Sequence, residues 1–157
     1  LAEKLNLPII DIGQIIRNYC TAEENLEGAD CNLMKKGELV SNELAASLLK
    51  NLLANPIYDK GFILDGYPRT LEQLKVYDPL LDKVIFISLS DDVSKERLAI
   101  RNRLDDTSEG IKRRLAWHHE NTNEILDYFR DKKMLIVVNG HSTEEKVFED
   151  ILSFLYS

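Results

Sequence analysis

The chain has little cysteine and histidine. Cys20 and Cys31 are its only cysteines, and it has three histidines. The two cysteines have no paired cysteine or histidine beside them, whereas a structural zinc site needs about four such ligands. We therefore expect no zinc, and we expect both cysteines to be free thiols in a reducing cytoplasm. His118 and His119 lack a third ligand at suitable spacing, so we assign them to packing or to the surface.

Positive charge and long apolar runs are also scarce. The chain has 20 basic and 27 acidic residues, a formal net charge of −7 at pH 7. It therefore lacks the basic surface with which proteins bind nucleic acids of any sequence. Apolar runs such as Val84–Ser90 have the length of a strand and fall short of the roughly 18 residues that span a membrane. We expect a cytoplasmic protein with no nucleic-acid or membrane partner.

The sequence does contain short apolar segments that alternate with amphipathic helical segments. With 44% apolar residues, its 157 residues are enough for one domain with a buried core. Uniformly apolar strands between helices are typical of a parallel sheet covered by helices on both faces, the α/β class. Ligands of such sheets bind beyond the carboxyl ends of the strands. We predict strands at residues 8–12, 61–66, 83–89 and 133–140, and a long helix at 108–131.

The segment Asp65-Gly66-Tyr67-Pro68-Arg69-Thr70 is the most informative motif in the chain. A carboxylate at the end of an apolar strand can hold Mg²⁺, directly or through water, beside phosphates. Gly66 allows a ligand to approach the backbone, and the guanidinium of Arg69 matches phosphate oxygens. Two alternatives stay open: Asp65 caps a helix or forms an ion pair, and Gln73 forms a capping box with Thr70.

Four arginines follow in a second cluster. Arg97 and Arg101 are four residues apart and project from one helical face. Several arginines around one cleft can stabilise a transferring phosphoryl group, whose charge spreads over its oxygens. The alternative is a solvated surface on which the arginines pair with aspartates. The cluster comprises Arg97, Arg101, Arg103 and Arg114, with Asp105 and Asp106 as the candidate partners.

Together these segments resemble the adenylate kinase family of nucleoside monophosphate (NMP) kinases over essentially the whole chain. The motif DGYPRT at 65–70 is among the most specific of that family, and GELV at 37–40 matches its base-covering segment. The resemblance implies a P-loop NTPase-type parallel sheet in a single domain, 1–157. Its parts would be a core at 1–13 and 59–157, a small helical NMP-binding insertion at about 14–58 and a minimal lid at about 101–106.

The resemblance also implies the roles of individual residues in phosphoryl transfer from Mg·ATP to an NMP, most simply ATP + AMP = 2 ADP. Asp65 would hold Mg²⁺ through water, and the short lid implies no zinc. The partners would be ATP and an NMP, bound by a monomer. The catalytic residues would be Arg69, Arg101, Arg103 and Arg114. ATP would contact Arg97, Arg101, Gly140 and Ser142. The NMP would contact Gly13, Arg17, Glu38, Leu39, Val40, Gly66, Arg69, Gln73, Arg103 and Arg114.

Besides the minimal lid, the sequence departs from the family pattern in two respects. No G-x-x-x-x-G-K-[ST] loop is present, and the chain opens at Leu1 without methionine. We therefore expect that the first, central strand and the phosphate-binding loop belong before Leu1 and have been truncated. Ile12 and Gln14 stand where the family has threonine and aspartate. These departures leave two alternatives: a UMP/CMP-type kinase, and a non-catalytic nucleotide-binding or interaction protein on the same scaffold.

Overall fold

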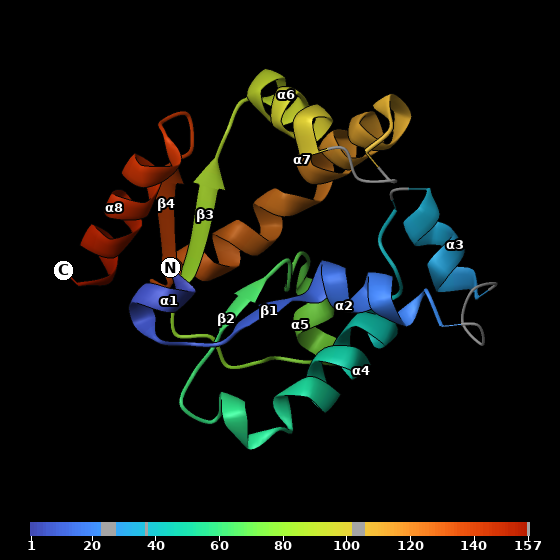
Figure 1. Ribbon diagram of the computed structural model, residues 1–157, viewed down its shortest axis with the longest axis horizontal. Helices are drawn as coiled ribbons and strands as arrows, with labels where there is room; N and C mark the ends of the chain where they lie inside the picture. The colour runs from blue at the N-terminus through green and yellow to red at the C-terminus, as the bar shows by residue number, and fades with distance from the viewer. Residues whose placement is uncertain (23–27, 37, 102–105, 157) are drawn as a thin grey trace. The chain divides into compact units, whose positions relative to one another are not determined.

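The computed structural model describes residues 1–22, 28–36, 38–101 and 106–156 (Figure 1). The chain divides into two compact units, Leu1–Pro79 and Leu80–Ser157, each with its own sheet. Within the described residues, no helix combines the length and the apolar character needed to cross a membrane.

The first unit is built on two parallel strands, β1 (Ile9–Asp11) and β2 (Ile63–Asp65). Their register pairs Asp11 with Asp65, so both strands end in a carboxylate at the same edge. Parallel strands need a long crossover connection, which helices supply here. The helices of this unit are α1 (Ala2–Leu5), α2 (Ile12–Tyr19), α3 (Ala29–Lys35), α4 (Asn42–Leu53), the 3-10 helix η2 (Pro56–Tyr58) and α5 (Leu71–Val76).

Helix α4 anchors the core of the first unit. The Ser41 hydroxyl oxygen accepts a hydrogen bond from the Leu44 N–H at 3.3 Å, which satisfies one of the unpaired donors of the first turn. Leu49 is 0% exposed, and burying a leucine contributes roughly 1.5–3 kcal/mol. It belongs to a buried cluster with Ile10, Ile12, Val40, Ala45 and Tyr67, which joins α4 to the carboxyl end of β1.

The second unit is built on β3 (Val84–Ser88) and β4 (Leu135–Asn139), which are also parallel. The crossover between them consists of α6 (Asp91–Arg101) and α7 (Ser108–Asp131), and α8 (Glu144–Leu155) follows β4. Thr107 caps α7 by accepting a hydrogen bond from the Gly110 N–H at 3.0 Å. The buried apolar side chains of this unit include Ile111, Ile125, Phe129, Val138 and Ile151.

The α/β class, the order of the elements and the bounds of the long helix 108–131 are confirmed. The described strands form two parallel pairs, β1–β2 and β3–β4, and the expectation that these strands are fully buried is wrong. Ile9 is 61% exposed next to the buried Ile10, and Val137 is 50% exposed next to the buried Val138. Successive side chains of a strand point to opposite faces, so β1 and β4 each have one covered and one open face at these positions.

Side-chain caps set the starts of two further helices. Helix α2 begins at Ile12 because Asp11 accepts a hydrogen bond from the Gln14 N–H at 2.9 Å, so Gly13 lies in the first turn of this helix. Helix α8 is capped by Thr143, which accepts a 3.3 Å hydrogen bond from the Lys146 N–H.

Candidate functional site

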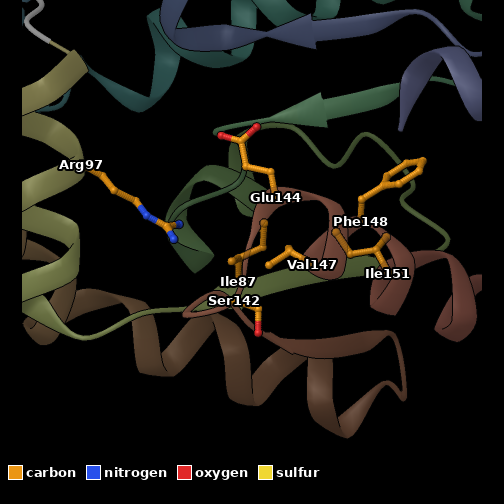
Figure 2. A pocket seen from close by; sticks show the side chains of 7 residues that line it. All are labelled: Ile87, Arg97, Ser142, Glu144, Val147, Phe148 and Ile151. Atoms are coloured by element: carbon orange, nitrogen blue, oxygen red, sulfur yellow. The ribbon is translucent and has the colours of Figure 1, made fainter.

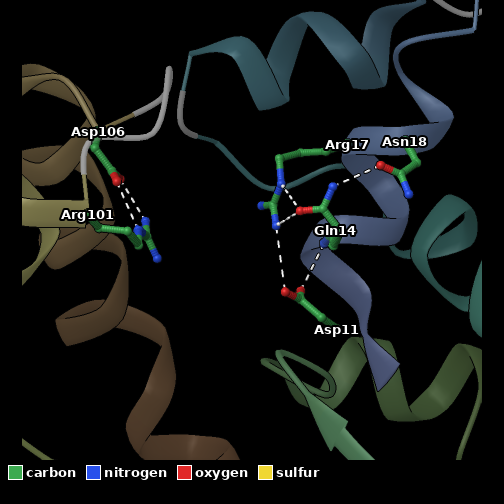
Figure 3. Close-up of polar contacts among 6 residues, drawn as sticks. All are labelled: Asp11, Gln14, Arg17, Asn18, Arg101 and Asp106. Atoms are coloured by element: carbon green, nitrogen blue, oxygen red, sulfur yellow. Dashed lines mark hydrogen bonds and ion pairs between the residues drawn. The ribbon is translucent and has the colours of Figure 1, made fainter. Parts of the chain in front are cut away.

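The first group of polar residues lies where β1 passes into α2. One carboxylate oxygen of Asp11 caps the helix, and the other lies 3.7 Å from Nη2 of Arg17. The Arg17 side chain folds back over Gly13, where an added Cβ would lie 3.3 Å from Nη1 and 3.2 Å from Asp11 Oδ1. Gly13 therefore makes room for the guanidinium. The side-chain oxygen of Gln14 accepts hydrogen bonds from Arg17 Nε at 3.2 Å and Nη2 at 2.9 Å (Figure 3).

The DGYPRT segment forms a tight turn at the end of β2. Asp65 is exposed at the strand end, and Gly66 has φ +83°, a conformation that side chains with a Cβ rarely adopt. A Cβ on Gly66 would also lie 3.1 Å from Ile12 Cγ2 and 3.2 Å from Arg69 Nη2. Arg69 Nε donates a 3.0 Å hydrogen bond to the Gly66 carbonyl oxygen. The turn therefore holds the Arg69 guanidinium close to the carboxyl end of β2.

Gln73 is buried directly behind this turn. It is 3% exposed, and its side-chain oxygen accepts a 2.7 Å hydrogen bond from the Arg69 N–H. Thr70 caps α5 by accepting from the Gln73 N–H at 3.2 Å. In a full capping box the Gln73 side chain would return to the Thr70 N–H. Only the first hydrogen bond of the predicted capping box therefore forms. The Gln73 side chain instead accepts from the Arg69 N–H and fixes the backbone of Arg69.

Tyr67 completes the support of the turn. Its hydroxyl lies 2.8 Å from the Gln73 carbonyl oxygen and 2.7 Å from the Tyr77 carbonyl oxygen. Burial is the main cause that raises the pKa of Tyr67 from 10.0 to about 12, and the neighbouring Tyr77 and Asp78 add to it. The phenol is therefore a structural hydrogen-bond donor at neutral pH.

The structure describes only part of the segment 37–40, which was expected to cover the nucleotide base. Gly37 lies outside the described residues. Glu38 is exposed, Leu39 is half-buried, and Val40 is 8% exposed within the core cluster. Ile12 is 3% exposed in the same cluster.

The expectation of free thiols is wrong. Cys20 and Cys31 form a disulfide, with their Cα atoms 5.4 Å apart. Cys20 follows α2 and Cys31 lies in α3, and the two residues are 3% and 1% exposed. Folding brings together two helices whose proximity the sequence spacing does not reveal, and this proximity permits the bond.

In the second unit, Arg97 lies close to the loop that follows β4. Its Nη2 donates a 3.0 Å hydrogen bond to the Gly140 carbonyl oxygen. A Cβ on Gly140 would lie 2.6 Å from Ile87 Cγ2, so the loop packs closely on β3. His141 Nε2 accepts from the Ser90 N–H at 3.2 Å, which ties this loop to the end of β3. A pocket of about 230 Å³ lies nearby, lined by Ile87, Arg97, Ser142, Glu144, Val147, Phe148 and Ile151 (Figure 2).

Arg101 and Arg114 share one carboxylate. Arg101 donates to both oxygens of Asp106, at 2.9 and 2.7 Å (Figure 3). Arg114 Nη1 donates to Oδ1 of the same carboxylate at 2.7 Å. The Asp106 side chain is 0% exposed, while those of Arg101 and Arg114 are 37% and 24% exposed. This is the ion-paired alternative that the sequence left open for these two residues. Arg103 and Asp105 lie outside the described residues.

His118 packs against an aromatic ring, and His119 lies at the surface beside an aspartate. The His118 ring stacks on Phe86 with centroids 6.0 Å apart, and its Nδ1 lies 2.8 Å from the Thr122 hydroxyl. His119 Nε2 lies 2.9 Å from Asp91 Oδ1. This interaction lowers the pKa of Asp91. The described part of the chain contains no group of three or more His, Cys, Asp or Glu residues arranged to hold a metal ion.

The structure thus groups Gly13 with Arg17, and Gly66 with Arg69 and Gln73, at the ends of the paired strands β1 and β2 in the first unit. It groups Arg97 with Gly140, and Arg101 with Arg114, within the second. Sequence reasoning missed Asp11, although an aspartate three residues before Gln14 is a helix-start signal. It named Gln14 only as a departure from the family and did not assign it a contact.

Comparison with known proteins gives independent information about the chain. A sequence model of the family described as adenylate kinase matches residues 1–134. Adenylate kinase 1 from Nostoc sp. is 34% identical, and the match covers 100% of this chain and 89% of that protein. Adenylate kinase from Rickettsia africae is 30% identical over 99% of this chain and 90% of its own length. Adenylate kinase from Mycobacterium tuberculosis is 35% identical over 99% and 88%, respectively.

Proposed function

The chain belongs to the adenylate kinase family, and from this premise we propose that it transfers the γ-phosphoryl group of Mg·ATP reversibly to AMP. The bond between the γ-phosphorus and the bridging oxygen breaks, its electron pair stays on the β-phosphate of ADP, and a phosphate oxygen of AMP bonds to the γ-phosphorus. The observation that carries the proposal is the pair of arginines, Arg17 and Arg69, oriented at the carboxyl ends of the paired strands β1 and β2.

In this proposal the first unit binds the acceptor. Arg17 and Arg69 would hold the AMP phosphate, because planar guanidinium groups donate two hydrogen bonds to phosphate oxygens. Gln73 would read the base together with Leu39 and Val40. Its side-chain oxygen already accepts from the Arg69 N–H, and the second lone pair and the amide NH₂ match the donor and acceptor edge of adenine.

The second unit would bind the donor and the transferring group. The loop at Gly140 and Ser142 would meet ATP beside Arg97, which is hydrogen-bonded to that loop. Arg101 and Arg114, with Arg103, would stabilise the charge that spreads over the phosphoryl oxygens. Phosphate oxygens would compete with the Asp106 carboxylate for the same guanidinium donors.

Asp65 fits a role in holding Mg²⁺ through water. It is an exposed carboxylate at a strand end, and Mg²⁺ in nucleotide sites is bound by one or two carboxylates, retained waters and the phosphates. When bound, the ion neutralises charge on the phosphates of ATP. Exclusion of water from the closed site would prevent hydrolysis of ATP.

The experiment is a coupled assay of ADP formation from Mg·ATP and AMP, followed by binding measurements on variants. We expect Arg69→Ala to weaken AMP binding at least tenfold and to change ATP binding less than twofold, because a charged hydrogen-bond partner is lost only from the acceptor side. Lys75→Ala removes an exposed positive charge from α5 and serves as the control. Equal weakening of both nucleotides by Arg69→Ala would contradict the acceptor role.

The choice of base is tested with a panel of monophosphates. We expect AMP to be the best acceptor, because Ile12 is packed in the core and Gln73 lies at the DGYPRT turn. Hydrogen bonds to a base discriminate strongly between substrates, whereas an apolar contact surface gives only about 10–200-fold discrimination. A pyrimidine monophosphate preferred tenfold over AMP would favour the UMP/CMP-type alternative instead.

A further inference from the structure

We propose that Gln14 is a positioning residue for the acceptor phosphate: its neutral side-chain oxygen holds the Arg17 guanidinium in the orientation that meets the phosphate of AMP. The inference rests on the proposed acceptor role of Arg17. It gives a function to a residue that departs from the family pattern, in which an aspartate stands at this place.

The Gln14 side chain accepts hydrogen bonds from one edge of the Arg17 guanidinium. Gln14 Oε1 accepts from Arg17 Nε at 3.2 Å and from Nη2 at 2.9 Å, so one oxygen engages the two nitrogens of the same edge (Figure 3). The two residues are three apart in α2, the spacing that places side chains next to each other on a helix. Rotation of the guanidinium about its long side chain is therefore restrained from its own helix.

Further hydrogen bonds hold Gln14 in the position from which it contacts Arg17. The Gln14 amide nitrogen donates a 2.8 Å hydrogen bond to Asn18 Oδ1, which fixes which end of the amide faces Arg17. The Gln14 backbone N–H is bound to Asp11 Oδ1, and the Nη1 side of Arg17 lies over Gly13. Asn18 therefore fixes the direction of the amide, and Asp11 fixes the backbone that carries it.

The chemistry of the amide matters as much as its position. A carboxylate here would also accept from Arg17, but it would add a second negative charge beside Asp11, whose Oδ2 already lies 3.7 Å from Nη2. A phosphate dianion would then approach a neutralised and partly repelling site. An amide oxygen orients the cation and leaves its charge in place for the anion.

The test compares AMP with adenosine, which lacks the phosphate, by calorimetric binding to the protein and its variants. Gln14→Met keeps the side-chain length and removes the acceptor oxygen. We expect it to weaken AMP binding about tenfold and to leave adenosine binding within twofold, since loss of orientation affects only the phosphate contact. We expect Asn18→Ala to have a smaller effect in the same direction. Asn51→Ala, an exposed amide on α4, is the matched control and should change neither ligand.

A double-variant cycle shows whether Gln14 acts through Arg17. If it does, Arg17→Ala combined with Gln14→Met binds AMP no more weakly than Arg17→Ala alone. Additive losses, equal weakening of AMP and adenosine by Gln14→Met, or unchanged AMP binding in Gln14→Met would each overturn the positioning role. A different result, unchanged AMP binding in Arg17→Ala itself, would instead refute the acceptor role of Arg17 on which the inference rests.

Discussion

In the first unit, Arg17 donates hydrogen bonds to the neutral Gln14 amide oxygen, with the Asp11 carboxylate at 3.7 Å, and Arg69 donates to the neutral Gly66 carbonyl oxygen, whereas in the second unit Arg101 and Arg114 share the carboxylate of Asp106 in shorter, charged hydrogen bonds. A neutral acceptor fixes the direction of a guanidinium and keeps its charge. A shared carboxylate fixes two guanidinium groups and cancels about one of their two charges. The difference is compatible with the proposed function, in which the first unit would bind the acceptor phosphate and the arginines of the second would exchange Asp106 for phosphate oxygens.

The two units also differ in what holds them together. The first has a continuous buried cluster around Leu49 and a disulfide between Cys20 and Cys31. In the second, the buried side chains include Val138 on β4, Phe129 on the long helix α7 and Ile151 on α8. The single tryptophan, Trp117, lies on α7, so its fluorescence reports on the second unit.

The largest expected effect comes from cavities in the two cores. Leu49→Ala should lower the free energy of unfolding by roughly 3–5 kcal/mol, because a side chain with no exposed surface is removed. Val138→Ala removes less volume and should cost roughly 2–3 kcal/mol. Urea unfolding followed by Trp117 fluorescence and by far-UV circular dichroism measures both. Identical transitions by the two probes in both variants would show that the two units unfold together and would contradict the view that each unit is stabilised by its own core.

Reduction of the disulfide should destabilise only the first unit. Closing the loop between two cysteines eleven residues apart contributes about 3 kcal/mol by restricting the unfolded chain. Dithiothreitol should therefore shift the circular dichroism transition and leave the Trp117 transition in place. The double variant Cys20→Ser with Cys31→Ser should not respond to the reductant. Two thiols that titrate in the unreduced, denatured protein would contradict the disulfide.

Alkaline pH should weaken the first unit through Tyr67. Its pKa is about 12 in the folded chain against 10.0 ordinarily, so the unfolded chain loses this proton first as the pH rises. The stabilisation is fully present below pH 10 and is lost between about pH 10 and 12, a change of about 2–3 kcal/mol. Urea unfolding at a series of pH values measures it. Tyr67→Phe should have a lower stability at neutral pH and a shallower decline in this range; an equally steep decline would exclude Tyr67 as its source.

The smallest effect concerns two helix caps. Ser41→Ala should cost about 1–2 kcal/mol and Thr143→Ala about 0.5–1 kcal/mol. The Ser41 hydroxyl both accepts from the Leu44 N–H and donates to Asp30 at 3.1 Å, so its removal breaks a contact to α3 as well. Thermal unfolding measures both variants, and Thr143→Ser should restore most of the lost stability. A larger loss for Thr143→Ala than for Ser41→Ala would show that the contact to Asp30 adds nothing.

Features encoded locally could be predicted from the sequence. The DGYPRT turn depends on Gly66, which adopts a positive φ, and on the cap at Thr70, and both are visible in the residues themselves. The same holds for the cap at Ser41 and for both ends of the helix 108–131. Each follows from a residue and its neighbours within one turn.

Features that depend on distant contacts could not be predicted. The cysteine spacing is compatible with thiols or a disulfide, and the packing of α2 near α3 decides between them. The burial of a strand depends on what covers it, so Ile9 and Val137 looked like core residues and are half-exposed or more. The sequence offered two aspartates to the arginines, and only the fold shows that Asp106 binds both Arg101 and Arg114.

The bond between Cys20 and Cys31 has a practical consequence for anyone handling the protein. It closes a covalent ring around residues 21–30, so a protease that cuts once inside this ring does not release a fragment. Nicked and intact molecules then have nearly the same mass and migrate together on a denaturing gel without reductant. They separate into two pieces only after the disulfide is reduced, so preparations judged intact by mass should also be analysed in the reduced state.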